Sequence, residues 1–361
     1  MQLSRREFLL GAAGLLTASG CAVHPGSDTG SQTITPIIPP GTPSLDRSLR
    51  LSLPQRAVAR STLRKFAHET SVRVLTLPQP PPTRFLLDLA AGEQGKLDVA
   101  LVEEETLRYL MATGLVEPID KTLVPERKLI SAPFNNPPYD PGGARSIGKD
   151  YSVIGFATTE SSLVDPPGSW KRLFQYARAN PHRVEIPNDS EVAVGAAMVA
   201  LGHPWSSANP SDLADAKALL GSLTGKLAVG GRLDRSTIDD RTAVIASGLG
   251  FREPTIGVHF VVPSEGTIIR MRSYCVLALA PDPVSSHAFL NATLDPQTVK
   301  ADVQVARLAS TVGASDYLIP SSLMDNTAIY PPAELADVIV FSTTTDAGAV
   351  ARRAVWDSVK T

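Results

Sequence analysis

VVPSEGTIIRMRSYCVLALAPDPVSSHAFLNATLDPQTV, residues 261–299, is the stretch that decides the fold. Its Pro-Ser-Glu-Gly sequence over 263–266 predicts a turn. The apolar run over 274–279 predicts a buried strand, and helices are expected near 284–293 and 296–311. A strand followed by helices at this spacing indicates an α/β architecture, in which helices cover a sheet.

The same alternation extends from this stretch towards both ends of the chain. Glycines stand where two of the helices should stop, at Gly92 and Gly114. The rhythm predicts a parallel sheet covered by helices, and a second α/β set begins after 169–174. The expected strands are 49–53, 72–75, 97–102, 151–156 and 256–262, and the further helices are 58–66, 84–91, 106–113, 190–201, 211–223 and 346–360.

Six segments in this order resemble the bacterial periplasmic spermidine/putrescine-binding proteins, the solute-binding receptors of polyamine ABC transporters. The opening stretch, with its P-x-E-G turn and its A-x-x-F-(I/L)-N-x-x-L-x-P helix, is the most specific of them. The others are LRKFAHETSVRV (63–74), LDVALVEEETLRYLMATGLVEPID (97–120), YSVIGFATT (151–159), SWKRLF (169–174) and DNTAIYPPAE (325–334).

The resemblance implies a two-lobed periplasmic-binding-protein fold of type II. Two crossover strands, near Phe156 and Ile268, would act as hinges between the lobes, and the ligand would bind in the cleft. The expected lobes are 48–155 with 268–316, and 156–267 with 317–361.

The first residues carry an export signal. SRREFLL (4–10) has the twin-arginine pattern, and the apolar run over 8–17 is too short to span a bilayer. The small residues before Cys21 resemble a lipoprotein cleavage site. We therefore expect a signal peptide over 1–20, lipidation of Cys21 and a Pro/Ser-rich flexible tether over 21–47. An ordinary apolar N-terminal helix is the alternative.

The composition excludes several classes of protein. A net charge of −2, from 34 basic and 36 acidic residues, gives no basic surface for nucleic acid. The sequence contains no further apolar stretch of the roughly 18 residues that a membrane helix needs. The six histidines lack metal-ligand spacing, and no nucleophile–base motif can be assembled. We expect no enzyme activity, no metal and no cofactor.

Several single residues are expected to have structural roles. Cys275 should be a small buried apolar residue rather than a reactive thiol. His259 is expected to be a satisfied core histidine, and Tyr109 and Tyr151 to be core residues.

The resemblance also assigns candidate ligand-binding positions. The family holds a linear polycation by aromatic faces and carboxylates. Here its first aromatic is replaced by Pro54 with Gln55 following, and the second by Ala246 before Ser247. Its W-M-D reads Arg270-Met271-Arg272, its P-S-x-Y reads Val102-Glu103-Glu104-Glu105, and Asp189 is the acid that remains. The implied ligand-binding residues are Gln55, Glu103, Glu104, Asp189, Ser247, Arg270 and Arg272.

Five of these residues also have a structural interpretation. Arg270 and Arg272 alternate along a strand and form a fork for an anion, or they point to solvent or pair with the nearby glutamates. Glu103 and Glu104 begin a helix, where acids favour the positive end of the dipole. Asp189 could be the N-cap of the helix that follows it.

Taken together, these features predict an extracytoplasmic solute-binding lipoprotein of an ABC importer. The family binds spermidine or putrescine, but the two arginines favour an anionic or zwitterionic ligand. The expected partners are a small polar ligand, an ABC permease and the membrane that holds the lipid anchor, and the protein should be a monomer at the periplasmic or outer face of the cytoplasmic membrane. The alternative is a surface scaffold or sensor that keeps the fold with a degenerate ligand site.

Overall fold

A computed structural model describes residues 48–360, apart from 165–167, 231–237, 239–240 and 254–255. The expected signal peptide, Cys21 and the tether lie outside the described residues. The chain divides into two compact units. Unit 1 holds the described residues up to Lys149 with Arg272–Ala306 and Ser310–Leu318; unit 2 holds Asp150–Met271, Arg307–Ala309 and Ile319–Thr361.

Unit 1 is built on a sheet with the strand order β2-β1-β3-β9. The parallel strands β1 and β2 pair in the register Leu49↔Val74, and β1 also runs parallel to β3. β9 runs antiparallel to β3, so the sheet is mixed and not parallel throughout as expected. The reason is that β9 returns into unit 1 from unit 2. The strands are β1 Ser48–Leu53, β2 Arg73–Pro78, β3 Val99–Glu103 and β9 Thr267–Val276.

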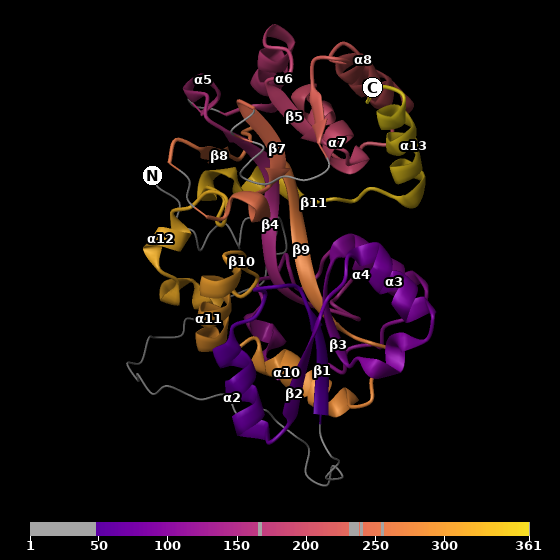
Figure 1. The fold of residues 1–361 in the computed structure, drawn as a ribbon, viewed down its shortest axis with the longest axis vertical. Coiled ribbons are helices and arrows are strands. Elements are labelled where there is room, and N and C mark those ends of the chain that lie inside the picture. Colours follow the sequence, from indigo (N-terminus) through magenta and orange to yellow (C-terminus); the bar gives the residue numbers. More distant parts are fainter. Residues whose placement is uncertain (1–47, 165–167, 231–237, 239–240, 254–255, 361) are drawn as a thin grey trace, which may run out of the picture. The chain divides into compact units, whose positions relative to one another are not determined.

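Helices cover both faces of this sheet (Figure 1). On one face Cys275 packs in a cluster with Phe85 and Leu107 of α3 and α4. On the other, the ring of Tyr274 meets Phe289 of α10, with 5.7 Å between ring centroids. Adjacent residues of β9 thus serve opposite faces, as the period of a strand requires. The helices are α2 Arg60–Thr70, α3 Pro82–Ala90, α4 Glu104–Ala112, α10 Pro283–Ala292 and α11 Pro296–Ala306, with 3-10 turns η1 Glu93–Lys96, η2 Pro125–Leu129 and η4 Gly313–Leu318.

Unit 2 has a second mixed sheet, in the order β4-β7-β5-β6. β5 is parallel to both β6 and β7, while β4 is antiparallel to β7 and β8. β11 runs parallel to β9 where that strand starts, at the pair Ile339↔Thr267. The strands are β4 Ile147–Thr158, β5 Val184–Pro187, β6 Ala228–Gly230, β7 Ala243–Ser247, β8 His259–Val261 and β11 Ile339–Phe341, and the short β10 is Ala309–Ser310.

The main core of unit 2 joins this sheet to five helices, α5, α6, α7, α8 and α13, of which the last three lie side by side (Figure 1). All three tryptophans of the chain, Trp170, Trp205 and Trp356, are buried in it. The helices of unit 2 are α5 Ser161–Val164, α6 Trp170–Ala179, α7 Ser190–Ala200, α8 Pro210–Gly221, α12 Ser321–Met324 and α13 Asp346–Asp357, with η3 Gly248–Phe251 and η5 Ala333–Val338. In the described part of the chain, no helix has both the length and the apolar character needed to cross a bilayer.

The Pro-Ser-Glu-Gly turn holds the start of α6. The Glu265 carboxylate accepts hydrogen bonds from the Ser169 hydroxyl (2.5 Å) and from the backbone N–H groups of Trp170 and Lys171 (both 3.1 Å). Gly266 has φ +114°, and a Cβ there would lie 2.7 Å from the Val338 carbonyl oxygen. The turn therefore needs both the carboxylate and the glycine to lead the chain into β9.

Some local expectations were wrong. The strand expected over 256–262 is only His259–Val261, because Gly257 takes a positive φ of 74°. The helix expected over 296–311 ends at Ala306, where Arg307 turns to a φ of 50°. His259 is exposed rather than a core residue, and Tyr109 is 46% exposed. Tyr151 and Cys275 are buried as predicted.

Candidate functional site

Two candidate residues of unit 2, Asp189 and Ser247, lie at the carboxyl ends of β5 and β7, and the third, Arg270, lies on β9. The strands β5 and β7 are parallel, with Val184 opposite Ala243, so their carboxyl ends meet at one edge of the sheet. Asp189 follows β5, and Ser247 is the last residue of β7. Open α/β sheets bind ligands beyond the carboxyl ends of their strands, so this edge is the candidate site of unit 2.

Asp189 has two partners at once. Its Oδ1 accepts hydrogen bonds from the backbone N–H groups of Glu191 (2.9 Å) and Val192 (3.3 Å). Asp189 is therefore the N-cap of α7, which is the structural role that the sequence suggested for it beside ligand binding. Its Oδ2 lies 3.3 Å from Nη2 of Arg270. The side chains are 44% and 24% exposed, so this ion pair stands at the surface of unit 2.

Ser247 is held by structural contacts. Its hydroxyl lies 2.7 Å from that of Ser152 on β4 and accepts the N–H of Leu249 (3.2 Å), which caps η3. Gly248 packs so closely that a Cβ there would lie 2.1 Å from the carbonyl oxygen of Ala328. The segment that replaces the family's W-N-G is therefore a packed turn.

The candidate residues of unit 1 lie at the ends of β1 and β3, which are also parallel neighbours. Gln55 is exposed in the turn after β1, and Glu103 is the exposed last residue of β3. Arg272 stands opposite Glu103 in the antiparallel register of β3 and β9, and it is only 6% exposed. This register places a buried cation beside the acidic end of β3.

Glu104 is part of the packing of α4 and not an open carboxylate. It is the first residue of the helix and 7% exposed, and its Oε1 lies 3.8 Å from Nη1 of Arg108, one turn further on. Burial, together with the charge of Glu104, raises the pKa of the Tyr139 hydroxyl. The acidic start of α4 also matches the positive end of the helix dipole.

Sequence reasoning missed Asp98, a fully buried carboxylate that joins three elements of unit 1. It accepts the backbone N–H of Arg50 on β1 (2.7 Å) and that of Asp282, the N-cap of α10 (2.8 Å). Burial raises its pKa. The signal was present in the sequence, since an aspartate at the start of an apolar strand must find hydrogen-bond donors.

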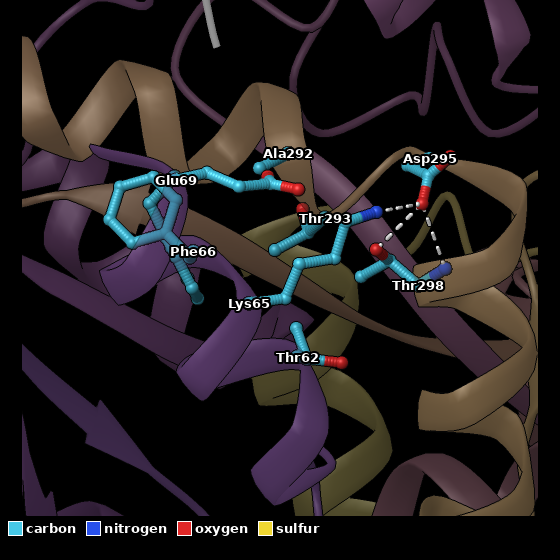
Figure 2. A pocket seen from close by; sticks show the side chains of 9 residues that line it. Thr62, Lys65, Phe66, Glu69, Ala292, Thr293, Asp295 and Thr298 are labelled. Atoms are coloured by element: carbon cyan, nitrogen blue, oxygen red, sulfur yellow. Dashed lines mark hydrogen bonds and ion pairs between the residues drawn. The ribbon is translucent and has the colours of Figure 1, made fainter. Parts of the chain in front are cut away.

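A separate small pocket of unit 1 lies where α2 meets the end of α10 and the start of α11 (Figure 2). Figure 2 shows Lys65 reaching Asp295, with 2.9 Å between Nζ and Oδ2, and Thr298 bonded to the same oxygen. The pocket offers about 10 Å³, the space of one water molecule, and no predicted ligand-binding residue lines it. It is too small for a solute.

A metal centre has no support in the described ranges, where no group of three or more histidine, cysteine or acidic side chains could hold an ion.

Comparison with known proteins confirms the expected resemblance. The putrescine/cadaverine-binding protein of Pseudomonas aeruginosa is 22% identical over 260 residues, which cover 66% of this chain and 72% of that protein. The spermidine/putrescine-binding periplasmic protein of Escherichia coli is 21% identical over 291 residues, or 75% of this chain and 80% of that one. No family model matches the chain.

Solved structures confirm the expected fold class. The substrate-binding protein PotD of a Streptococcus pneumoniae spermidine/putrescine ABC transporter, solved with calcium and HEPES, superposes with a TM-score of 0.78 at 17% identity, over 87% of this chain and 98% of that one. The binding protein AgtB of A. tumefaciens, in complex with agropinic acid, gives a TM-score of 0.58 at 15% identity, over 88% and 97%. The fold is that of the two-lobed periplasmic solute-binding proteins.

Proposed function

We propose that this chain is the extracytoplasmic solute-binding protein of an ABC importer, and that it captures a small polar ligand and presents it to a permease. The observation that carries the proposal is the fold shared with PotD over almost the whole of that chain, together with the polyamine-binding relatives. Within unit 1 the candidate contacts are polar side chains at the carboxyl ends of β1 and β3, among them Gln55. Within unit 2 they are polar side chains at the carboxyl ends of β5 and β7, among them Asp189.

The proposed ligand carries a carboxylate. Arg270 and Arg272 stand where the family resemblance implies an aromatic residue and a carboxylate. A guanidinium binds a carboxylate by two parallel hydrogen bonds and repels an ammonium group. A protein of the same fold, AgtB, is seen with agropinic acid, so the fold accommodates acids as well as polyamines.

We also propose that the protein is exported by the twin-arginine route and anchored by lipid on Cys21. The support is the sequence of residues 4–21 and the periplasmic location of the relatives. Incorporation of labelled palmitate into the wild type but not into Cys21→Ser tests the anchor. Retention of Arg5→Lys/Arg6→Lys in the cytoplasm tests the route.

Thermal-shift screening of the purified protein tests the function. Polyamines, amino acids and organic anions are compared, since a ligand that binds only the folded state raises Tm by mass action. A carboxylate-bearing compound should give the largest shift and also change the fluorescence of the buried tryptophans. Stabilisation by spermidine alone, weakened in Arg272→Asp, contradicts the proposed ligand class. A screen without any stabilising compound contradicts the solute-binding function.

The alternative, a scaffold that keeps the fold without a working ligand site, is favoured by one observation. The Arg270–Asp189 pair neutralises charges that a ligand would otherwise meet. Uptake assays in cells that lack the protein separate the two, because loss of a scaffold leaves import of every tested solute unchanged.

A further inference from the structure

Both oxygens of the Asp189 carboxylate have partners within unit 2. One oxygen caps α7 through two backbone N–H groups, and the other pairs with Nη2 of Arg270 at 3.3 Å. An ammonium group that approached Asp189 would have to compete with a guanidinium of the same charge. Because arginine stays protonated at any physiological pH, this competition does not disappear with a change of conditions.

Arg270, by contrast, keeps hydrogen-bonding capacity. A guanidinium has five N–H donors, and within the described residues the pair with Asp189 is its one hydrogen bond. The side chain is 24% exposed and contacts Asp189 through Nη2, so its other N–H groups remain as donors for a ligand. A planar donor edge of this kind fits the two oxygens of a carboxylate.

We infer that Arg270 is the specificity-determining residue of unit 2, with Asp189 as its positioning residue, and that the pair accepts a ligand carboxylate and excludes diamines. This inference rests on the proposed function, because it assumes that this edge of unit 2 faces the ligand. It changes the role of Asp189, which orients a cation instead of binding one from the ligand.

Two probes of matched length test the inference. Putrescine and 4-aminobutanoate share one ammonium group and differ at the other end, where one has an ammonium and the other a carboxylate. Isothermal titration calorimetry of the full chain compares the wild type with Arg270→Gln and Asp189→Asn. Asparagine caps helices as well as aspartate does, so Asp189→Asn keeps the start of α7. Arg307→Gln is the matched control, because Arg307 forms a similar surface pair in unit 2 with Glu253, at 3.4 Å.

Arg270→Gln leaves Asp189 with an unmatched negative charge, so its affinity for putrescine should exceed that of the wild type at least tenfold. Any affinity for 4-aminobutanoate should fall at least tenfold. Asp189→Asn should leave putrescine binding no stronger than in the wild type, and Arg307→Gln should change neither probe. Circular dichroism and Tm confirm that each variant is folded.

Equal putrescine affinity in the wild type and Arg270→Gln, including no detectable binding to either, overturns the inference. A rise in putrescine affinity in Asp189→Asn overturns it as well. These outcomes are distinct from failure of the proposed function, which is the absence of any stabilising solute in the broad screen of the wild type.

Discussion

Replacing Glu265 by alanine is expected to destabilise unit 2 by about 1.5–3 kcal/mol. The carboxylate receives three hydrogen bonds at the start of α6, from the Ser169 hydroxyl and from the N–H groups of Trp170 and Lys171. It lies on the turn before β9, 96 residues from Ser169 along the chain. Its removal therefore detaches the end of a helix from the turn that directs a central strand.

The magnitude follows from the interactions that the carboxylate makes with the helix. Removal of a helix N-cap costs about 0.5–2 kcal/mol, and removal of a charge at the positive end of the dipole costs about 0.3–1 kcal/mol. The bonds from Ser169 and Lys171 are exposed, and water replaces them in part, which keeps the sum below three full charged hydrogen bonds. Glu265→Gln retains one acceptor oxygen, so its cost should be about half as large, or roughly 1 kcal/mol.

Urea unfolding followed by tryptophan fluorescence measures the effect, because all three tryptophans lie buried in unit 2 and Trp170 is the first residue of α6. Glu334→Gln is the matched control, since Glu334 is an exposed glutamate in the first turn of η5. The order of stability should be wild type and control, then Glu265→Gln, then Glu265→Ala. If Glu265→Ala unfolds within about 0.5 kcal/mol of the wild type, a typical surface substitution, the capping argument is refuted.

Three further predictions concern buried groups. Burial raises the pKa of the Cys275 thiol to about 12. In a Cys21→Ser chain, where Cys275 is the remaining cysteine, this thiol should resist a thiol reagent at pH 8 in the folded protein and react fully in urea. Fast labelling of the folded protein contradicts the burial of Cys275. Burial also raises the pKa of Asp98 above its value in the unfolded chain. The stability that the protonated carboxyl contributes is therefore full below the unfolded pKa and is lost as pH rises through the folded pKa. Unfolding curves from pH 4 upward should show this loss in the wild type and a flatter pH profile in Asp98→Asn. Arg352 is fully buried, with 3.5 Å between its Nη1 and Oε2 of Glu191, and Arg352→Ala should cost about 3–5 kcal/mol, because the partly buried carboxylate loses its cationic partner and keeps only neutral hydrogen-bond donors. A smaller cost for the double variant Arg352→Ala/Glu191→Ala than for Arg352→Ala identifies the broken ion pair as the cause, and equal costs argue against it.

Local signals predicted only part of the fold. The apolar period placed helices such as α7, α8 and α13 within a few residues, and Asp189 was recognisable as a possible N-cap because it precedes an apolar helix. It did not predict the short strands β5, β6, β7 and β11, and it found only the last part of β9, which begins at Thr267. Local patterns failed for His259 and Tyr109, which were expected in the core and are exposed. A strand pattern says which residues share a face, but whether that face is covered depends on elements far away in the sequence.

The candidate site required contacts that no local pattern contains. Arg270 and Asp189 are 81 residues apart, and the position of Arg272 opposite Glu103 follows from the register of β3 and β9. The Pro-Ser-Glu-Gly motif was recognisable as a turn, but the sequence does not show that its Glu265 carboxylate binds the backbone N–H groups at the start of α6. A motif of this kind identifies a fold, whereas the hydrogen bonds that its side chains form depend on segments far away in the sequence.

The double role of Asp189 bears on how a ligand can be inferred from a family resemblance. Its Oδ1 holds the start of α7, so replacing it by a residue that cannot cap costs stability whatever the ligand is. An acid at this position is thus explained by the helix alone and does not by itself indicate a polyamine ligand. The helix places no such demand on the partner of Oδ2, which here is Arg270. In the inference above, the choice between a cationic and an anionic solute is therefore assigned to the residue on β9, because an acid at the N-cap of α7 is compatible with either.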